Sequence, residues 1–507
     1  MENILIIGGG TAGFMTAAAL VKAFPNKKIS LIESKTIPTV GVGESTIVPF
    51  RKFLKFLEIK DEDFLKECDG SYKLSIRFQD FYKKGSYFHY PFGRPFLENT
   101  KAGFNDWWFK KTVNPDLPFS DYADSFFPMM ALVNQNKILK KSRGLDFEIN
   151  RDSAFHIDAT KFGNWLKEKY CKPKGLNHIV DDIVSVQQDE NGIVSLNNKY
   201  KADLYIDCTG FKSLLLGQTL KEEFISFEHL LPNNSAWATH IPYQNKEKEL
   251  KCYTNCTAYN NGWIWDIPLW SRRGTGYVYS DKFISDDDAL TEFKQYLKID
   301  NLEFKKIKMK VGIHKRVWVK NVVAIGLAAG FIEPLESNGL YTVHEFLLSL
   351  LRNLRGDTAS QLDRDTFNFH TRQVSQNFAE FVALHYALSH REDTPYWKAN
   401  KNKEWSTELL NRISPLTEGI STAIIQKSFL FHFPSELGFH CIAAGMNWAS
   451  TDIYNLIYVG NFTHNQVMAA GATSTALLNK KIQQWKELAH SHPTLYQYLK
   501  EEVYHEA

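Results

Sequence analysis

Short apolar runs alternate with small or charged residues at the start of the chain. Residues 4–7 are apolar without a break and predict a buried strand, and residues 11–24 are rich in alanine and predict a helix. Residues 28–32 predict a second strand, which ends at Glu33. A strand, a helix and a second strand in this order predict a βαβ unit, whose two strands lie parallel in one sheet.

Two later apolar runs have the same character. Residues 204–206 and 322–325 are each followed at once by small residues and glycine, which is typical of strands that end at a ligand. From residue 340 onward the pattern becomes largely helical, most clearly over residues 343–354 and 366–388. We find no repeat and no linker, so we expect the modules to share one continuous body.

The middle of the chain predicts a helix and a hairpin. Residues 162–170 have a helical pattern, and Asp158 precedes them as a cap. Residues 179–186 and 193–196 flank the turn sequence at 189–192, which predicts an antiparallel pair of strands.

The charge balance argues against a polyanionic partner. Among 507 residues, 60 basic and 57 acidic side chains leave a net charge of +3, so we expect no nucleic acid and no membrane surface as partner. No segment approaches the roughly 18–20 uninterrupted apolar residues of a membrane helix. The start of the chain also lacks a basic leader, and we therefore expect a cytoplasmic protein that acts on small molecules.

The six cysteines do not form a metal-ligand pattern. Only Cys252 and Cys256 lie close together in sequence, and neither a second such pair nor a histidine cluster accompanies them. We therefore expect no zinc or other metal site, and reduced thiols.

The loop after the first strand has the pattern of a dinucleotide-binding site. Residues 8–13 read GGGTAG and stand between a strand and a helix, where a tight turn, a close approach of the backbone and close helix packing all require glycine. The free N–H groups of the helix N-terminus favour phosphate there. The expected contacts are Gly8, Gly10, Thr11, Ala12 and Gly13, with Glu33 on a ribose.

A second glycine-rich loop distinguishes between cofactors. Residues 41–46 read GVGEST soon after Glu33, and residues 207–210 read DCTG after a later strand. In this respect the chain resembles FAD-dependent monooxygenases and halogenases, which thread such loops along an extended flavin. The resemblance implies FAD, with Gly43, Glu44, Ser45, Val180 and Leu327 among its contacts.

Three further motifs resemble the flavin-dependent halogenases. Residues 263–268 read WIWDIP and match the family's Trp-x-Trp-x-Ile-Pro motif. Lys73 falls where the family carries its catalytic lysine, about thirty residues after the second glycine-rich loop. Residues 331–339 read FIEPLESNG and resemble the family's Glu-Pro-Leu-Glu-Ser-Thr-Gly segment, with Asn338 in place of Thr.

The resemblance implies a role for each of these residues. Lys73, Glu336 and Ser337 would be catalytic, with Lys73 receiving hypohalous acid either as an ammonium or as the amine of a haloamine. Burial would favour the amine. Backbone amides of Asn338 and Gly339 would hold the halide ion. Four residues would form a wall between flavin and substrate: Trp263, Trp265, Ile267 and Pro268.

Two softer likenesses lie around His156 and His385, and both are expected outside the active site. The alternative to a halogenase is a single-component FAD monooxygenase that hydroxylates an aromatic compound. Such enzymes commonly have Gly-Asp at the later flavin strand, where this chain has Gly326-Leu327. A flavoprotein that only carries electrons leaves the tryptophan motif, Lys73 and Glu336 unexplained.

We therefore expect an α/β fold in which a Rossmann-type FAD-binding module, similar to glutathione reductase and monooxygenases, is fused to a largely helical substrate module. Residues 1–90, 150–225 and 315–350 would form the first, and residues 91–149, 226–314 and 351–507 the second.

The expected partners are a small electron-rich aromatic substrate, a halide ion and a separate NAD(P)H-dependent flavin reductase, since we see only one dinucleotide fingerprint. Assembly as a homo-oligomer stays open. Residues 439–448, including Trp448, do not match the substrate segment of family members that take free tryptophan. An indole or phenol is therefore the expected substrate.

Overall fold

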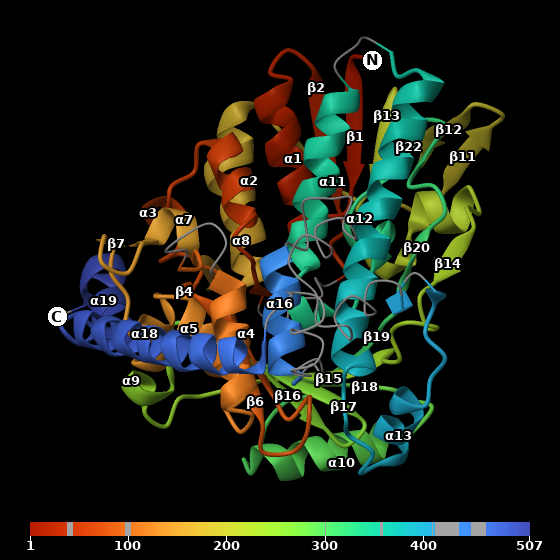
Figure 1. Cartoon of the computed structure of the whole chain (residues 1–507). Coiled ribbons are helices and arrows are strands. Elements are labelled where there is room, and N and C mark those ends of the chain that lie inside the picture. The colour runs from red at the N-terminus through yellow and green to blue at the C-terminus, as the bar shows by residue number, and fades with distance from the viewer. Residues whose placement is uncertain are drawn as a thin grey trace.

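The early apolar runs and those near residues 204 and 322 come together in one six-stranded sheet (Figure 1). The computed structural model describes residues 1–37, 44–96, 103–299, 301–354, 358–407, 409–410, 436–447 and 463–506. Across the sheet the strands are β10 (Asn177–Val180), β2 (Lys28–Glu33), β1 (Asn3–Ile7), β13 (Leu204–Asp207), β22 (Val322–Ala324) and β21 (Trp318–Val319). All neighbours are parallel except β21 and β22, which confirms the predicted βαβ unit and α/β class.

Helices cover this sheet and explain why its strands are apolar at almost every position. Helix α1 (Thr11–Ala23) is buried over most of its length because it packs against β1 and β2 as well as against α8 (Ala159–Trp165) and α11 (Gly339–Asn353). Figure 1 shows these helices beside β1 and β2. The predicted Asp158 cap is confirmed, since its carboxylate accepts a hydrogen bond from the Lys161 amide.

A second, seven-stranded sheet was not predicted from the sequence. Its strands are β19 (Lys305–Lys308), β15 (Ser235–Ile241), β18 (Arg273–Tyr279), β17 (Gly262–Pro268), β16 (Tyr253–Tyr259), β5 (Ser75–Gln79) and β6 (Tyr87–Pro91). One face of β17 turns Ile264 toward α10 (Asp286–Leu297), and the opposite face carries the tryptophans into the main core. Five of its strands, β15 to β19, lie within residues 226–314, which were predicted to belong to a largely helical module.

A small sheet stands between the two large ones. It consists of β3 (Glu44–Ser45), β9 (Ala154–Ile157) and β4 (Ser71–Lys73), and β4 is followed after one residue by β5 of the large sheet. His156 of β9 pairs with Ser45 on one side and with Ser71 on the other. Three segments that are far apart in sequence therefore meet beside Lys73.

The remaining predicted elements are present with one shift. The helix after Asp158 continues as a π-helix, Leu166–Cys171, and the predicted late helices are α11 and α12 (Gln361–Ala387). The hairpin prediction was wrong in its first arm. Residues 179–180 belong to β10 in the parallel sheet, and the hairpin is formed by β11 (Val186–Asp189) and β12 (Gly192–Leu196).

The other described elements are short or lie toward the end of the chain. The helices are α2 (Phe50–Leu57), α3 (Asp61–Phe64), α4 (Gly103–Val113), α5 (Asp121–Phe126), α6 (Met130–Asn134), α7 (Ile149–Asp152), α9 (Lys246–Glu249), α13 (Pro395–Lys401), α16 (Glu436–Gly445), α18 (His464–His490) and α19 (Leu495–Leu499). The strands are β7 (Lys141–Ser142), β8 (Phe147–Glu148), β14 (Phe224–Ser226), β20 (Gly312–His314) and β23 (Gly330–Phe331).

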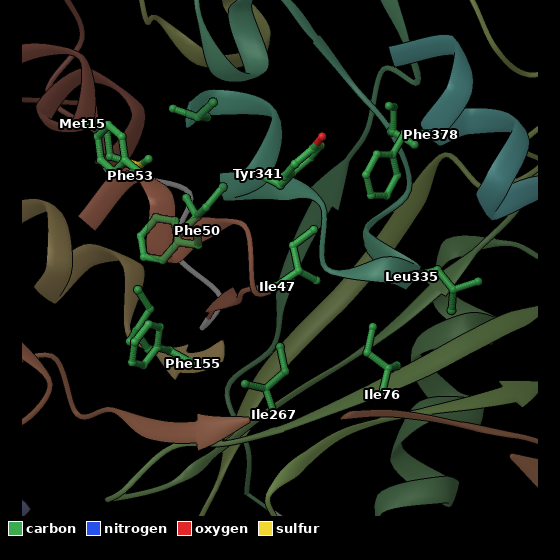
Figure 2. Close-up of a cluster of buried hydrophobic side chains, with 14 of the residues drawn as sticks. Met15, Ile47, Phe50, Phe53, Ile76, Phe155, Ile267, Leu335, Tyr341 and Phe378 are labelled. Atoms are coloured by element: carbon green, nitrogen blue, oxygen red, sulfur yellow. The ribbon is translucent and has the colours of Figure 1, made fainter. Parts of the chain in front are cut away.

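One buried apolar cluster fills the space where these sheets and helices meet. Figure 2 shows Ile47, Ile267 and Leu335 in this cluster; Ile267 is a predicted site residue, and Ile47 and Leu335 lie within two residues of Ser45 and Glu336. The predicted site is therefore built into the core, and polar groups there must find partners within the protein.

The last described segment packs beside the strand that carries Lys73. The ring of Tyr504 stacks on Trp270 with centroids 4.2 Å apart, and its hydroxyl donates to the carbonyl of Gly70, 2.9 Å away. Gly70 directly precedes β4, so residues late in the chain support the strand that carries Lys73.

Candidate active site

The glycine loop fits a dinucleotide. Gly8 has φ +114°, and a Cβ there would lie 2.3 Å from the carbonyl oxygen of Cys208. A Cβ on Gly13 would lie 1.9 Å from the oxygen of Gly8. Helix α1 begins after Gly10 with no side-chain cap, which leaves the amides of its first turn free for phosphate oxygens.

Glu33 lies at the carboxyl end of β2, as the ribose prediction requires. Its Oε2 lies 2.7 Å from Nε2 of His178 and 3.4 Å from Nζ of Lys167, two neighbours that the sequence did not identify. Val180 pairs with Glu33 along β10 and is 46% exposed. A ribose hydroxyl would share the carboxylate with His178 and Lys167.

Two other strands end near the same loop. The buried carboxylate of Asp207 accepts hydrogen bonds from the amides of Leu215 and Leu216, which orders the chain after β13. Gly326 has φ +68°, and a Cβ there would meet Cβ of Ala12 at 2.8 Å. The chain after β22 thus lies directly against the start of α1.

Leu327 borders a cavity of about 280 Å³ on the far side of this contact, together with Phe211, Lys212 and His314. Gly43 lies outside the described residues. Ser45 is buried in β3, and its hydroxyl lies 2.6 Å from that of Thr254.

Lys73 is completely buried at the end of β4. Its Nζ donates to the carbonyl of Thr46 at 3.0 Å and to the hydroxyl of Ser337 at 2.8 Å, and it lies 5.1 Å from the ring centre of Phe92. Burial lowers the pKa of Lys73 to about 7, although nearby Cys256 and Glu336 act in the opposite direction. Near neutral pH the ammonium and the amine are therefore both populated.

Glu336 is also buried, and desolvation raises its pKa. Its Oε1 lies 3.1 Å from Nε2 of His385, which comes from α12. Nδ1 of His385 lies 3.2 Å from the carbonyl of Val382 and must carry a proton there, since a carbonyl only accepts. This contact with His385 lowers the pKa of Glu336 and so opposes the effect of burial.

The residues after Glu336 form a tight turn into α11. Ser337 has φ +58° and lies between Lys73 and Ser45. Asn338 precedes the helix, and its side chain donates to the carbonyl of Glu333 at 3.2 Å. Gly339 is the first residue of the helix, so its N–H has no acceptor within the helix. The side-chain amide of Asn338 thus braces the turn that carries the predicted halide donors.

The tryptophan motif occupies β17. Trp263 and Trp265 lie on one face with ring centroids 6.2 Å apart, and Ile267 follows on that face. Nε1 of Trp265 is buried and has no hydrogen-bond partner among the described residues. Pro268 points its carbonyl at Ser71, which donates to it at 2.6 Å.

A buried carboxylate that sequence reasoning missed fixes Trp263. Oε2 of Glu333 accepts hydrogen bonds from the Tyr386 hydroxyl at 2.6 Å, the Asn233 amide at 2.9 Å and the Trp263 indole at 3.4 Å. Burial raises the pKa of Glu333. This residue therefore joins the predicted wall, the halide turn and α12.

Two expectations about histidines were wrong. His385, expected outside the active site, contacts Glu336, and His156 lies 2.9 Å from the Thr254 hydroxyl in the hydrogen-bonded surroundings of Lys73. Both are completely buried. The signal was a histidine in an otherwise apolar stretch, but one sequence cannot tell which group such a side chain meets.

Some predictions fall on other parts of the chain. Trp448 lies outside the described residues. No helix in the described part of the chain combines the length and apolar character needed to cross a bilayer. The six cysteines are all buried and free. Cys252 and Cys256 do not pair, because they lie four residues apart along extended chain at β16.

The family described as "Tryptophan halogenase" matches residues 3–457. "Tryptophan 6-halogenase SttH" of Streptomyces toxytricini is 34% identical over 444 residues, 81% of this chain and 83% of that protein. "Tryptophan 7-halogenase RebH" of Lentzea aerocolonigenes is 31% identical over 484 residues, 88% and 89% of the two chains. The solved structure "VirX1 apo structure" is 36% identical, with a TM-score of 0.89 over 100% of both chains.

Proposed function

Because this chain belongs to the tryptophan halogenase family, we propose that it uses reduced FAD, oxygen and a halide ion to halogenate an electron-rich free aromatic substrate of the indole or phenol type. When bound, reduced FAD supplies the electrons with which oxygen and halide give hypohalous acid. The residues described above would bind the participants, direct the oxidant and move protons.

One observation carries the proposal: the amino group of Lys73 is fully buried beside Ser337, in a site that also holds Glu336 and the two tryptophans. A lysine needs a reason to be buried, because desolvation opposes its charge. With its pKa near 7, Lys73 can donate a hydrogen bond to the oxidant as ammonium or accept the halogen as amine.

The remaining roles follow from charge and position. Glu336 would stabilise the positive charge that develops on the aromatic ring and receive the ring proton, and Nε2 of His385 lies 3.1 Å from its carboxylate. Backbone amides at Asn338 and Gly339 would hold the halide. The wall formed by Trp263 and Trp265 would keep the substrate from the flavin, so that halogenation replaces direct hydroxylation.

The substrate class that we propose is broader than the substrate for which the relatives are named. SttH and RebH are named for tryptophan, whereas residues 439–448 here do not match the segment that binds free tryptophan in such enzymes. We infer that indoles or phenols without the amino-acid group are accepted, and that bromide or iodide, being easier to oxidise, turns over faster than chloride.

The test is product analysis. The purified chain, FAD, NADH and a separate flavin reductase are incubated with tryptophan, indole and phenol in chloride, bromide or iodide, and products are identified by mass spectrometry. Halogenated indole or phenol is expected. Hydroxylated products without halogen would support the monooxygenase alternative instead. Without the reductase, no rapid oxidation of NADH is expected.

Matched variants test the lysine. Lys73→Met keeps an unbranched side chain but removes the amine, and it should leave flavin binding intact while halogenation falls to a few per cent or less. Lys52→Met, at an exposed position on α2, is the control and should retain activity. Halogenation by Lys73→Met at the control rate would remove Lys73 from its role.

A further inference from the structure

A continuous row of hydrogen-bonded groups begins at Lys73 and ends at a backbone carbonyl. In order, the row consists of Lys73, Ser337, Ser45, Thr254, His156, Ser71 and the carbonyl of Pro268. The successive distances between hydrogen-bonded atoms are 2.8, 3.2, 2.6, 2.9, 3.2 and 2.6 Å. Every side chain that takes part is at most 5% exposed. We call this set the hydroxyl row.

The two ends of the hydroxyl row fix the direction of every proton. Ser71 gives its one proton to the carbonyl of Pro268, so it must accept from Nδ1–H of His156. Nε2 of a neutral His156 is then bare and accepts from Thr254. Thr254 in turn accepts from Ser45, Ser45 accepts from Ser337, and Ser337 accepts from Lys73. Between Lys73 and Nε2 of His156, each hydroxyl proton therefore points away from the lysine and toward the imidazole.

The fold builds the hydroxyl row on one face of the small sheet. His156 of β9 lies in register between Ser45 of β3 and Ser71 of β4, and Lys73 follows two residues after Ser71 on the same face. Thr254 of β16 closes the gap between Ser45 and the imidazole. Nε2 of His156 is the one bare basic nitrogen along the row.

We propose that the hydroxyl row is a proton relay that lets Lys73 change between ammonium and amine by exchanging its proton with His156, without admitting water. In one passage Nζ of Lys73 loses a proton, each of the three hydroxyls takes one and passes one on, and Nε2 of His156 gains one. Charge moves from the amine to the imidazole, and no heavy atom needs to move. The reverse passage restores the starting state.

This inference rests on the proposed role of Lys73 in halogenation. The haloamine form of that role requires the buried lysine to lose a proton before it accepts the halogen and to regain it afterwards. The other ionisable groups near Lys73 are Cys256 and Glu336, and burial and the charge of Lys73 both keep the pKa of His156 well below its usual range. His156 therefore holds the proton only transiently.

The sharpest test removes the base and keeps the hydrogen bonds. In His156→Gln the side-chain amide can still accept from Thr254 and donate to Ser71, but it cannot hold the proton. Thr254→Val interrupts the row at similar shape, Thr254→Ser keeps the hydroxyl, and Thr257→Val is a buried control on the same strand outside the row. Circular dichroism and thermal unfolding identify variants that fail to fold.

The readouts are single-turnover halogenation in mixtures of H₂O and D₂O, and NMR titration of lysines labelled at Cε, with the Lys73 signal identified by its loss in Lys73→Met. For wild type, Thr254→Ser and Thr257→Val we expect a rate that depends on deuterium content along a curve, because several protons move together. His156→Gln and Thr254→Val should be slower by at least about ten-fold and lose the curvature. Thr254→Val should also lower the pKa of Lys73. The interrupted row of hydroxyls would no longer strengthen the hydrogen bond that Ser337 accepts from the ammonium.

A folded His156→Gln with the wild-type rate and curvature would overturn the relay. So would a Thr254→Val variant whose rate and Lys73 titration match wild type. These outcomes are separate from failure of the proposed function, which would appear as wild type giving no halogenated product, and from loss of the role of Lys73, which would appear as halogenation by Lys73→Met at the control rate.

Discussion

Lys73 combines a charged residue type with complete burial, and this combination has a cost that pH can reveal. In the unfolded chain its pKa returns to the ordinary value of 10.5, whereas in the folded protein it is about 7. Between these two values the unfolded chain binds more protons than the folded one, so the contribution of Lys73 to stability improves as pH rises. Below pH 7 the full penalty applies.

Lys73→Met should therefore stabilise the protein most at low pH. The shift from 10.5 to about 7 corresponds to at most about 5 kcal/mol, at about 1.4 kcal/mol per pKa unit. We expect the free energy of unfolding of Lys73→Met to exceed that of wild type clearly at pH 7 and by much less at pH 10, because the lost hydrogen bonds offset part of the gain. Urea denaturation at both pH values measures the difference, and an equal difference at both would contradict the buried-charge account.

The pKa of Glu336 is subject to two opposing effects. His385 lowers the pKa of Glu336, which burial raises. In His385→Leu the pKa of Glu336 should rise further, so a higher pH is needed to keep it ionised. We expect the acidic limb of the pH–rate profile for halogenation to move to higher pH.

The control for this prediction is His390→Leu, at a more exposed position next to the same helix, which should leave the profile in place. An unmoved acidic limb in His385→Leu would show that ionised Glu336 does not limit the rate.

At the scale of single residues, the sequence predicted which side chains carry the proposed chemistry better than it predicted the residues that they contact. Lys73, Glu336 and Ser337 could be identified because they stand in motifs that resemble a known family. Their neighbours could not, because His156 and Thr254 reach the site only through tertiary contacts between distant strands. Glu333 stands in one of these motifs, but its contact with Trp263 forms only in the folded chain. A buried polar residue in an apolar stretch was the available signal, and it does not say what the residue binds.

The first strand, loop and helix form the element on which cofactor binding depends. Because a Cβ on Gly13 would lie 1.9 Å from the oxygen of Gly8, Gly13→Ala must displace either the loop or α1. We expect FAD affinity to fall by at least about ten-fold, since the phosphate-binding amides move with the loop. Quenching of flavin fluorescence during titration measures the affinity.

Gly85→Ala is the matched control. Gly85 also has a positive φ, +83°, but a Cβ there would meet no atom within 4 Å. It should cost about 1–2 kcal/mol of stability through backbone strain and leave FAD affinity unchanged. Equal affinity in the two variants would mean that the loop tolerates the added methyl group.

Elements with a clear period or sharp boundaries were predicted well. The βαβ unit, the late helices and the Asp158 cap are all present, because apolar runs and capping residues are local signals. The seven-stranded sheet was not predicted, because its strands combine glycine, threonine and aromatic residues on both faces and show no clear apolar alternation, as in Arg273–Tyr279. The hairpin was misplaced because residues 179–180 are equally suited to the parallel sheet.

At the scale of the whole molecule, residues late in the sequence pack against the segments next to Lys73. Tyr504 stacks on Trp270 and donates a hydrogen bond to Gly70, and the ring centroids of Tyr72, on the strand that carries Lys73, and of Tyr498 lie 6.1 Å apart. Tyr504→Ala should lower the free energy of unfolding by about 3 kcal/mol, as expected for removing a buried aromatic ring. Activity and folded structure should then be lost together at a lower urea concentration.

Tyr87→Ala, which removes a tyrosine that is 41% exposed, is the comparison and should cost much less. If Tyr504→Ala matched Tyr87→Ala in both unfolding and activity, the late segment would not support the catalytic strand.

The contact between Tyr504 and Gly70 joins positions 434 residues apart. A ribosome must therefore add more than four hundred residues after Gly70 before this contact can form. A chain truncated before Tyr504 would keep the glycine-rich loop near its start but would lack this support for the strand that carries Lys73.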